Sequence, residues 1–290
     1  MNGMFLSIDF EDFAHDLKRD LRLWETGPLR IDRLWEGFEA IETFLEAQGG
    51  ARVTFFCTGV IADQAPDLIA HIASRGHEIA CHAHYHDTLD RMEAAEVDRA
   101  LGRARTALEA AANREVTGFR APKFRIDKTG PDQYRAVERR FAYDSSLNAG
   151  SVAQVAAFRA AMGLSTLRLL PIYRGQAVPG LPPLNLGGSY LKLFPARVAD
   201  RLVAGAQAAG FTPHVYLHPY EFLSSGAFEL TRAELAPLGP RKQLFWLTRQ
   251  AQWHRVGNAG LPAKLGRLAS TLGLGGRLCD NLDAADPLAA

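Results

Sequence analysis

Four of the nine histidines of this 290-residue chain lie within one stretch of twelve residues, GHEIACHAHYHD (residues 76–87). His82 and His86 are four residues apart, so both imidazoles can point at one ion if a helix begins just after His82. Two imidazoles and one carboxylate leave coordination positions open for water and substrate, which is typical of a catalytic zinc site. In this interpretation His84 faces away from the ion, and His77, which precedes the apolar run, is structural.

Other polar side chains also stand where short apolar runs end. These residues are Asp9, Glu11, Asp12, Arg120, Asp144 and His218. In a parallel α/β barrel the carboxyl ends of all strands lie on one face, and that face carries the site. Taken singly, each residue has an ordinary explanation, such as a helix cap for an aspartate. Their joint pattern, together with the two histidines, predicts one convergent site.

Apolar runs and amphipathic segments alternate along the chain. Residues 31–50 carry apolar side chains at three- and four-residue intervals and end in two glycines, which is typical of a helix. Further helices are predicted at residues 66–76, 94–112 and 130–140, and strands at residues 52–57, 77–81, 116–119, 140–146 and 211–219. Such alternation predicts a parallel sheet covered by helices. Residues 148–189 are richer in Gly and Pro, and we expect long loops there around the short strand LRLLPI, forming a wall of the site.

The composition is that of an ordinary soluble protein. Thirty-three basic residues against 32 acidic ones leave no global field that would favour nucleic acid as a partner. The three cysteines are odd in number and lack CxxC spacing, so neither a disulfide framework nor a thiolate zinc site is indicated. No secretion signal is visible, and no run approaches the ~18 apolar residues that a membrane-spanning helix needs. We therefore expect a cytoplasmic protein, with a membrane-peripheral location as the alternative.

Residues 241–290 differ in character from residues 1–240, which we predict to form the barrel domain. From residue 241 to residue 277 there are seven basic residues and no acidic one, interleaved with Phe245, Trp246 and Trp253. This pattern predicts a helical C-terminal extension, whose simplest interpretation is a solvated helix pair. The alternative is a peripheral membrane contact, because basic residues attract anionic headgroups while Trp and Phe favour the interface.

The motifs together resemble the polysaccharide deacetylases of carbohydrate esterase family 4, over residues 5–222. SIDFED resembles the first motif of the family, and CHAHYH resembles its His-x-x-x-His metal motif. The segments RAP (residues 120–122), YDSS (residues 143–146) and LHP (residues 217–219) are similar to the remaining three. The fold that this resemblance implies is α/β, a distorted and incompletely closed (β/α) barrel with a helical C-terminal appendage.

The resemblance also implies a role for each acidic residue of the first motif. Asp9 is the general base, and Asp12 joins His82 and His86 as a ligand of a divalent metal, most simply Zn²⁺. The extra acidic residue between the two aspartates, Glu11, is the substitute ligand. Cobalt, nickel or iron would suit the same ligands.

The remaining motifs imply the positioning and acid groups. Arg120 holds the base carboxylate by bidentate pairing, and Asp144 orients and keeps protonated the general acid, His218. Pro122 and Lys123 line the substrate groove, where the family usually has an aromatic or small residue in place of this lysine.

The implied function is metal-dependent removal of an N-acetyl group from a sugar in a polysaccharide or glycan precursor. One alternative is hydrolysis of another C–N bond, in a small amide or cyclic ureide, since Lys123 could favour an anionic ligand. A second is an inactive carbohydrate-binding relative, which the presence of both Asp9 and His218 disfavours. A third is a non-haem iron oxygenase, which shares the two-histidine, one-carboxylate set but is expected to have a largely antiparallel fold.

Overall fold

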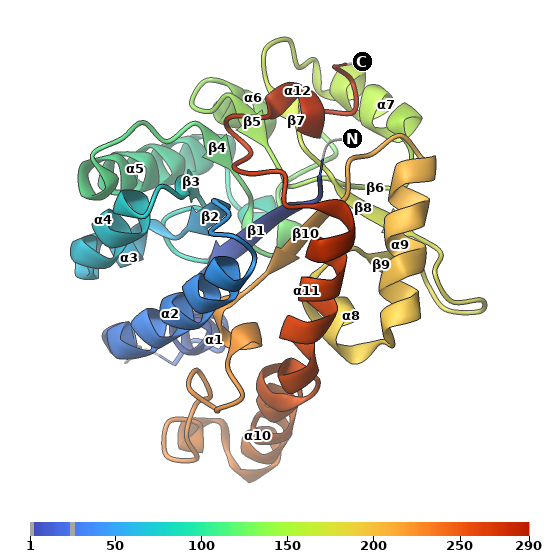
Figure 1. Cartoon of the computed structure of the whole chain (residues 1–290). Coiled ribbons are helices and arrows are strands. Elements are labelled where there is room, and N and C mark those ends of the chain that lie inside the picture. Colours follow the sequence, from blue (N-terminus) through green and yellow to red (C-terminus); the bar gives the residue numbers. More distant parts are fainter. Residues whose placement is uncertain (1–2, 24–26, 290) are drawn as a thin grey trace.

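The computed structural model describes residues 3–23 and 27–289, and its centre is one parallel sheet (Figure 1). The seven strands stand in the order β10-β1-β2-β3-β4-β5-β7, and every neighbouring pair is parallel. Their bounds are β1 (Phe5–Phe10), β2 (Thr54–Cys57), β3 (Glu78–Cys81), β4 (Gly118–Phe119), β5 (Tyr143–Asp144), β7 (Arg168–Leu169) and β10 (His214–Leu217). All residues of β1, β2 and β3 are buried, because helices cover one face of the sheet and the other face lies inside the half-barrel.

The barrel is incompletely closed, as the sequence resemblance predicted. The two edges of the main sheet are β7 and β10, and a small second sheet lies between these edges. It is formed by β6 (Asn148–Ala149), β8 (Ile172–Gly175) and β9 (Leu184–Asn185). A single bridge joins Gly187, just after β9, to Tyr216 of β10. Only glycine fits at Gly187, since its φ is 141° and a Cβ there would stand 2.5 Å from the Tyr216 carbonyl oxygen.

Helices follow most of the strands and cover the outside of the sheet (Figure 1). Their bounds are α1 (Phe13–Asp20), α2 (Ile31–Ala47), α3 (Gly59–Gln64), α4 (Pro66–Ser74), α5 (Ala94–Ala112), α6 (Asp132–Glu138), α7 (Val152–Met162), α8 (Gly188–Leu193), α9 (Ala196–Ala208), α10 (Pro240–Arg255), α11 (Leu261–Leu272) and α12 (Leu282–Ala285). Helix α5 occupies the predicted residues, and a reciprocal capping box between Glu93 and Glu96 fixes its start. Short 3₁₀ turns are η1 (Leu89–Arg91), η2 (Pro122–Phe124), η3 (Pro219–Phe222), η4 (Ala236–Leu238) and η5 (Asn258–Gly260).

The expectation of long loops throughout residues 148–189 is wrong, because this segment contains α7 and the small sheet. The Ser151 side chain accepts from the Gln154 N–H at the start of α7, and Gly163 ends the helix in the left-handed conformation. Between them the run AQVAAFRAAM is rich in alanine, the strongest helix former. The Gly- and Pro-rich stretch is confined to residues after β8.

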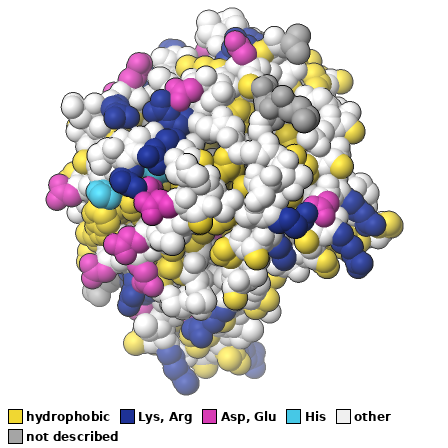
Figure 2. Space-filling model, viewed as in Figure 1, with side chains coloured by type: hydrophobic (Ala, Val, Ile, Leu, Met, Phe, Trp, Pro, Cys, Tyr) yellow, Lys and Arg dark blue, Asp and Glu magenta, His cyan; other side chains and the backbone are white. Residues whose placement is uncertain are grey.

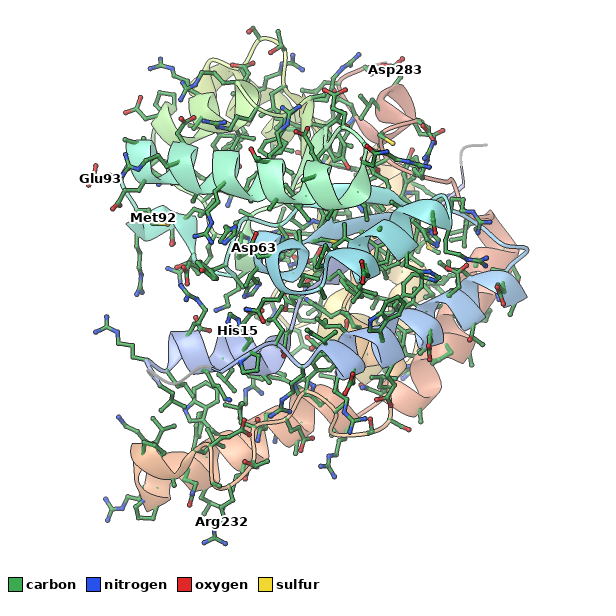
Figure 3. All side chains as sticks on the ribbon, turned by 90° about the vertical axis from the view of Figure 1, so that its left-hand side faces the viewer. His15, Asp63, Met92, Glu93, Arg232 and Asp283 are labelled. Carbon is green, nitrogen blue, oxygen red and sulfur yellow. The ribbon has the colours of Figure 1, made fainter. Side chains whose placement is uncertain are left out.

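The C-terminal segment is helical, as predicted, and it packs closely on the rest of the chain. Leu261, Leu265 and Leu268 of α11 belong to the same hydrophobic core as the strands and α2 to α5. Helix α10 contacts α1 through a smaller apolar cluster that includes Leu17 and Trp246. Figure 3 shows α1, which carries the labelled His15, next to the C-terminal helices. A division into two domains at residue 240 stays a prediction. Among the described residues, no helix has the length and apolar character required to cross a membrane.

Candidate metal and acid–base site

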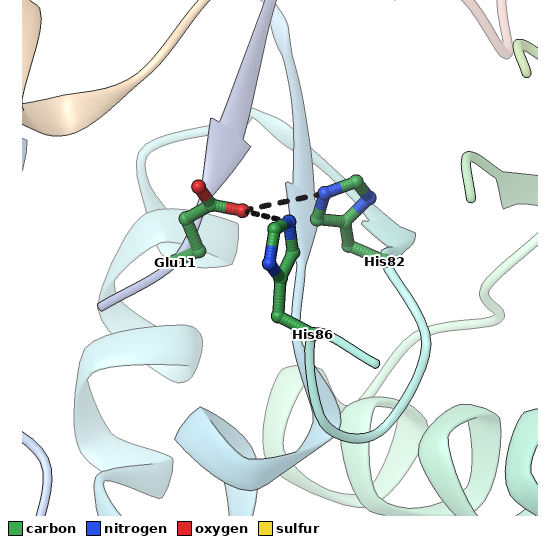
Figure 4. A group of neighbouring side chains, drawn as sticks. All are labelled: Glu11, His82 and His86. Atoms are coloured by element: carbon green, nitrogen blue, oxygen red, sulfur yellow. Dashed lines mark ion pairs between the residues drawn. The ribbon is translucent and has the colours of Figure 1, made fainter. Parts of the chain in front are cut away.

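Three buried side chains converge at the carboxyl ends of β1 and β3 (Figure 4). Glu11 Oε2 lies 2.7 Å from His86 Nε2 and 3.4 Å from His82 Nε2. One carboxylate oxygen and two imidazole nitrogens therefore lie within 4.8 Å of one another, close enough to bind one ion. All three side chains are at most 8% exposed.

A loop, and not the expected helix, brings the two histidines together. Residues 82–88 form no helix in the structure, and Ala83 has a φ of +60°, which turns the chain sharply after β3. His82 Nδ1 donates to the Arg120 carbonyl oxygen at 2.8 Å, so its Nε2 carries the lone pair that faces Glu11. This hydrogen bond sets the tautomer and ring orientation that a metal ligand requires.

Asp12, the ligand preferred from the sequence, does not join this group. It caps α1, where its Oδ1 accepts from the backbone N–H groups of Ala14 and His15. Its Oδ2 accepts from the Arg30 N–H at 2.6 Å. Both oxygens are thus occupied by helix capping and by the loop before α2, and the neighbouring Glu11 takes the place expected for Asp12.

Asp16, which the sequence did not single out, supports the histidine pair from α1. Its Oδ2 lies 3.8 Å from His86 Nδ1 and makes no hydrogen bond to the described residues. Burial raises the pKa of Asp16 to about 6, against the opposing charge of His86. Burial alone would lower the pKa of His86, but Glu11 and Asp16 outweigh it and raise this pKa to about 9. The carboxylates therefore hold a positive charge at this position, which a proton on His86 or a metal cation can supply.

A buried arginine holds the proposed base. Arg120 is fully buried, and its Nη1 donates to Asp9 Oδ1 at 2.5 Å and to Ser7 Oγ at 2.9 Å. Its Nη2 donates to Ser145 Oγ, and the guanidinium lies 4.1 Å from the centre of the Phe56 ring. The contact with Asp9 uses one nitrogen, so the expected bidentate pairing is not formed. The second nitrogen of the guanidinium group, Nη2, instead binds Ser145, which directly follows β5.

The partner of His218 differs from the one expected. His218 Nδ1 lies 2.9 Å from Glu221 Oε2, and the His218 backbone N–H donates to the same oxygen at 3.0 Å. Glu221 is fully buried in the turn η3, with Lys192 Nζ 3.8 Å from its other oxygen. Burial lowers the pKa of His218, but the hydrogen bond and the charge of Glu221 outweigh burial and raise it. The sequence signal for Glu221 is its place three residues after His218, the spacing of a capping box.

Asp144 instead organises the loop that carries Arg120. Its carboxylate accepts from the backbone N–H of Ser146 at 3.0 Å and from Ser146 Oγ at 2.5 Å. Ser146 Oγ in turn accepts from the Ala121 N–H at 2.8 Å. Burial raises the pKa of Asp144 to about 6. The residue is therefore linked to the site through Ala121, and not through His218.

Asp9, the group of Glu11, His82 and His86, and His218 share one cavity of about 460 Å³. Its lining residues are Asp9, Glu11, Phe13, Asp16, Leu17, Asp20, His82, His86, Lys123, Phe124, Asn185, Ser189, Tyr190, Tyr216, His218, Tyr220, Trp246 and Trp253. Lys123 lies at the wall of this cavity, as predicted, and its Nζ is paired with Asp20. Pro122, also expected to line the groove, is buried at the start of η2 and is not among the residues that line this cavity. The C-terminal tryptophans Trp246 and Trp253 contribute to the same cavity.

The other two histidines of the cluster lie away from the ion site. His77 is structural, as predicted: its Nε2 donates to Glu42 Oε2 at 2.7 Å and its Nδ1 accepts from the Val53 N–H. His84 is buried, with its Nε2 3.4 Å from Asp63 Oδ2. It faces α3 and not Glu11, which agrees with its expected position outside the group.

Comparison with known proteins finds similarity to one family over part of the chain. The family model described as polysaccharide deacetylase matches residues 29–142. This match agrees with the resemblance that the motifs show. Peptidoglycan deacetylase-like protein FGM2 of Gibberella zeae is 32% identical over 98 residues, which are 33% of this chain and 28% of that protein. The alignment thus spans little more than a quarter of that relative.

Solved structures of polysaccharide deacetylases share the fold. A candidate polysaccharide deacetylase from Mycobacterium smegmatis superposes with a TM-score of 0.55 at 23% identity, over 94% of this chain and 93% of the other. The Bc1960 peptidoglycan N-acetylglucosamine deacetylase gives a TM-score of 0.52 at 14% identity, over 98% and 90%. At these identities the likeness establishes the deacetylase fold. The matched family segment includes His82, His86 and Arg120, whereas Asp9 and His218 lie outside it.

The side chains at this position of the deacetylase fold suit a divalent cation. The Glu11 oxygen that faces the histidines is buried, and its close contacts to the His86 and His82 nitrogens lack the geometry of a hydrogen bond. A carboxylate and two neutral imidazoles, with space for water, are the donor set of catalytic zinc. His82 already has its second nitrogen engaged, and Asp16 lies beside the second nitrogen of His86.

Proposed function

We propose that this chain is a metal-dependent hydrolase that removes an N-acetyl group from a sugar of a polysaccharide or glycan precursor. The observation that carries the proposal is the shared cavity. It unites a carboxylate held by a buried arginine, a carboxylate–histidine–histidine group and a histidine paired with a buried glutamate. Hydrolysis of an unactivated amide needs a base, a site for the oxyanion and an acid for the leaving amine.

Glu11, His82 and His86 would hold the cation, with Asp12 retained as the cap of α1. When bound, a divalent cation lowers the pKa of water and polarises the acetyl carbonyl. The choice of Zn²⁺ rests on the donor set, and the dependence on metal agrees with the general behaviour of the family.

Asp9 would accept the proton of the attacking water. Arg120 donates a hydrogen bond to the carboxylate of Asp9 and fixes one of its oxygens, because the arginine is itself held by Ser7 and Ser145. The other oxygen of Asp9 would then be the one that accepts the proton.

His218 would donate the proton that the leaving nitrogen requires. Glu221 accepts from Nδ1, so the protonated ring presents Nε2–H as the donor. As the C–N bond breaks, the amine takes this proton and the acetyl group leaves as acetate. Lys123 would line the groove beside the reacting group, and Pro122 would act only by starting the turn η2 that carries this lysine.

The alternative of another C–N substrate rested on the charge of Lys123. The ion pair with Asp20 offsets that charge, so the structure gives less reason to expect an anionic ligand there. The alternative of an inactive carbohydrate-binding relative is disfavoured, because Asp9 is held by Arg120 and His218 is paired with Glu221. N-acetylglucosamine oligomers are the first substrates to assay, because the relatives named above are described as peptidoglycan deacetylases.

The test combines metal analysis with acetate release from N-acetylglucosamine oligomers. We expect His82→Ala to lose the metal and turnover, and Asp9→Asn to retain the metal but lose turnover. His84→Ala is the matched control, because it removes a buried histidine of the same loop that lies outside the group. Normal turnover by both His82→Ala and Asp9→Asn would refute the proposal.

A further inference from the structure

A second pocket adjoins the catalytic cavity. It has a volume of about 600 Å³ and lies between α8 and α10. Ser189, Tyr190, Tyr216, His218 and Trp253 line both spaces. A ligand whose reacting group sits in the catalytic cavity therefore passes His218 and enters this pocket with its next part.

The rim of this pocket is unusually apolar for an exposed surface. In the part of the chain that the structure describes, six large apolar side chains are exposed: Leu181, Tyr190, Leu193, Leu244, Phe245 and Val256. Three of them, Tyr190, Leu193 and Val256, line this pocket, and Leu193 and Val256 are each about half exposed. Leu193 and Val256 can offer a sugar neither hydrogen bonds nor an aromatic face. Clustered exposed apolar side chains are typical of a site that covers apolar ligand surface.

One cation at the pocket has no acidic partner. Arg249 contacts the neutral Gln252 side chain at 3.3 Å and lies 4.3 Å from the centre of the Trp253 ring. No carboxylate of the described residues forms an ion pair with it. By contrast, Arg255 is paired with Glu229, and Arg267 with Asp200. Figure 2 shows Lys and Arg side chains at the end of the molecule that α10 forms. At the pocket itself, Arg249 is the cation available for an anion.

We propose that this second pocket binds the anionic linkage and the first part of the apolar chain of an amphiphilic substrate. In such a substrate the N-acetylated sugar is joined through an anionic group, such as a phosphate, to a hydrocarbon chain. The sugar occupies the catalytic cavity, Arg249 contacts the anion, and Leu193 and Val256 contact the chain. This inference rests on the proposed function for the sugar end, and it adds the class of molecule that carries the sugar.

The test measures binding of decyl phosphate, kept below its micelle concentration, to the metal-loaded full-length protein by isothermal titration calorimetry. We expect decyl phosphate to bind at least about tenfold more tightly than inorganic phosphate, which lacks the chain, and than decyltrimethylammonium, which has the opposite charge. The affinity should be unchanged after the metal is chelated, because the pocket does not include the metal group. Equal affinity for decyl phosphate and inorganic phosphate would overturn the proposal.

Two pocket variants and two controls locate the binding. Arg249→Gln should weaken decyl phosphate binding about tenfold, since it removes the charge and leaves a shorter, neutral polar side chain. Val256→Asn should weaken decyl phosphate binding severalfold, because it removes an apolar contact to the hydrocarbon chain of the ligand. Lys242→Gln and Leu244→Asn are matched controls, because both residues are exposed on α10 but do not line the pocket. If the controls weaken binding as much as the pocket variants, α10 acts as a general membrane-contacting surface and the pocket proposal is wrong.

The outcome also separates this inference from the proposed function. Decyl phosphate binding without acetate release from any N-acetylated sugar would contradict the function and leave the pocket assignment intact. Acetate release without decyl phosphate binding would leave the function intact and refute the amphiphilic substrate.

Discussion

The pairing of His218 with Glu221 gives a quantitative prediction for the variant Glu221→Gln. The amide oxygen of glutamine can accept both hydrogen bonds that Glu221 Oε2 accepts, from the His218 backbone N–H and from Nδ1. The substitution therefore removes mainly a charge. Two unit charges about 4 Å apart attract by about 4 kcal/mol at an effective dielectric constant of about 20, which is an upper bound for this pair. Lys192, 3.8 Å from the other oxygen of Glu221, keeps its hydrogen bonds to Trp253 and Asn258.

The sign of the effect follows from the role of His218. A general acid must be protonated, so the rate falls as the pH rises through the pKa of His218, which Glu221 raises against burial. Removing the charge lowers this pKa, so the alkaline limb of the rate profile moves to lower pH. One pH unit corresponds to about 1.4 kcal/mol, and we expect a displacement of at least about one pH unit. Below the limb the variant should retain much of its activity.

The assay is the initial rate of acetate release between acid and alkaline pH, with the metal saturating. Asp144→Asn is the control, because Asp144 is the residue that the motifs assigned to His218 and the structure places on Ser146. Whatever the height of its rate profile, the alkaline limb should remain at the wild-type pH. A displaced limb in Asp144→Asn together with an unmoved limb in Glu221→Gln would refute the reasoning.

Three further predictions concern the metal group, the base and the C-terminal helices. Glu11→Gln should weaken metal binding by more than about 100-fold, beyond the loss typical of an outer-shell change, as measured by competition with a chelator. Arg120→Lys should retain the fold but lose most turnover, because a lysine cannot hold Asp9 and the loop after β5 at the same time. Leu265→Ala should lower the free energy of unfolding by about 2–5 kcal/mol, measured by urea titration, because Leu265 is fully buried in the common core.

A control variant or a further outcome accompanies each of these three predictions. Asp12→Asn should keep both the metal and the fold, since asparagine caps helices as well as aspartate does. If Asp12→Asn lost the metal and Glu11→Gln kept it, Asp12 and not Glu11 would be the metal ligand. If Arg120→Lys were about as active as the wild type, the guanidinium group of Arg120 would not be needed to hold Asp9. Two separate unfolding transitions in the wild type, with Leu265→Ala changing one of them, would support the division at residue 240.

The sequence was informative about the fold where helices and strands are long and uniform. The sequence predicts the alternation of β2, α4, β3 and α5. The two strands are short runs of mostly apolar residues, and the two helices each have one apolar face. Composition alone does not predict helix α7, because the Gly and Pro residues that follow β8 dominate the composition of residues 148–189. Its own alanines and its serine cap were the better local signal.

The site was predictable in its residue types and less so in its partners. Strand ends brought Asp9, His82 and His218 to one cavity, since that follows from parallel topology alone. Which carboxylate meets which histidine depends on loop geometry that periodicity does not encode. Glu11 and Asp12 are neighbours in the sequence, and the start of α1 decides that the second one caps the helix. The assignment of Glu11 as ligand stays a prediction until metal binding is measured.

The neighbours of β1 determine when the polypeptide can fold during synthesis. β1 is synthesised before the other strands described here, yet one of its two partners is β10, about two hundred residues later. Met4 also bridges to Leu274, and the Leu278 N–H donates to Thr54 at the start of β2. Because these late segments complete the first strands, β1 and β2 cannot gain all their native partners until residues 270–280 have been synthesised. Shortened chains that lack residues 270–280 should accordingly depend more on chaperones than point variants of surface residues do.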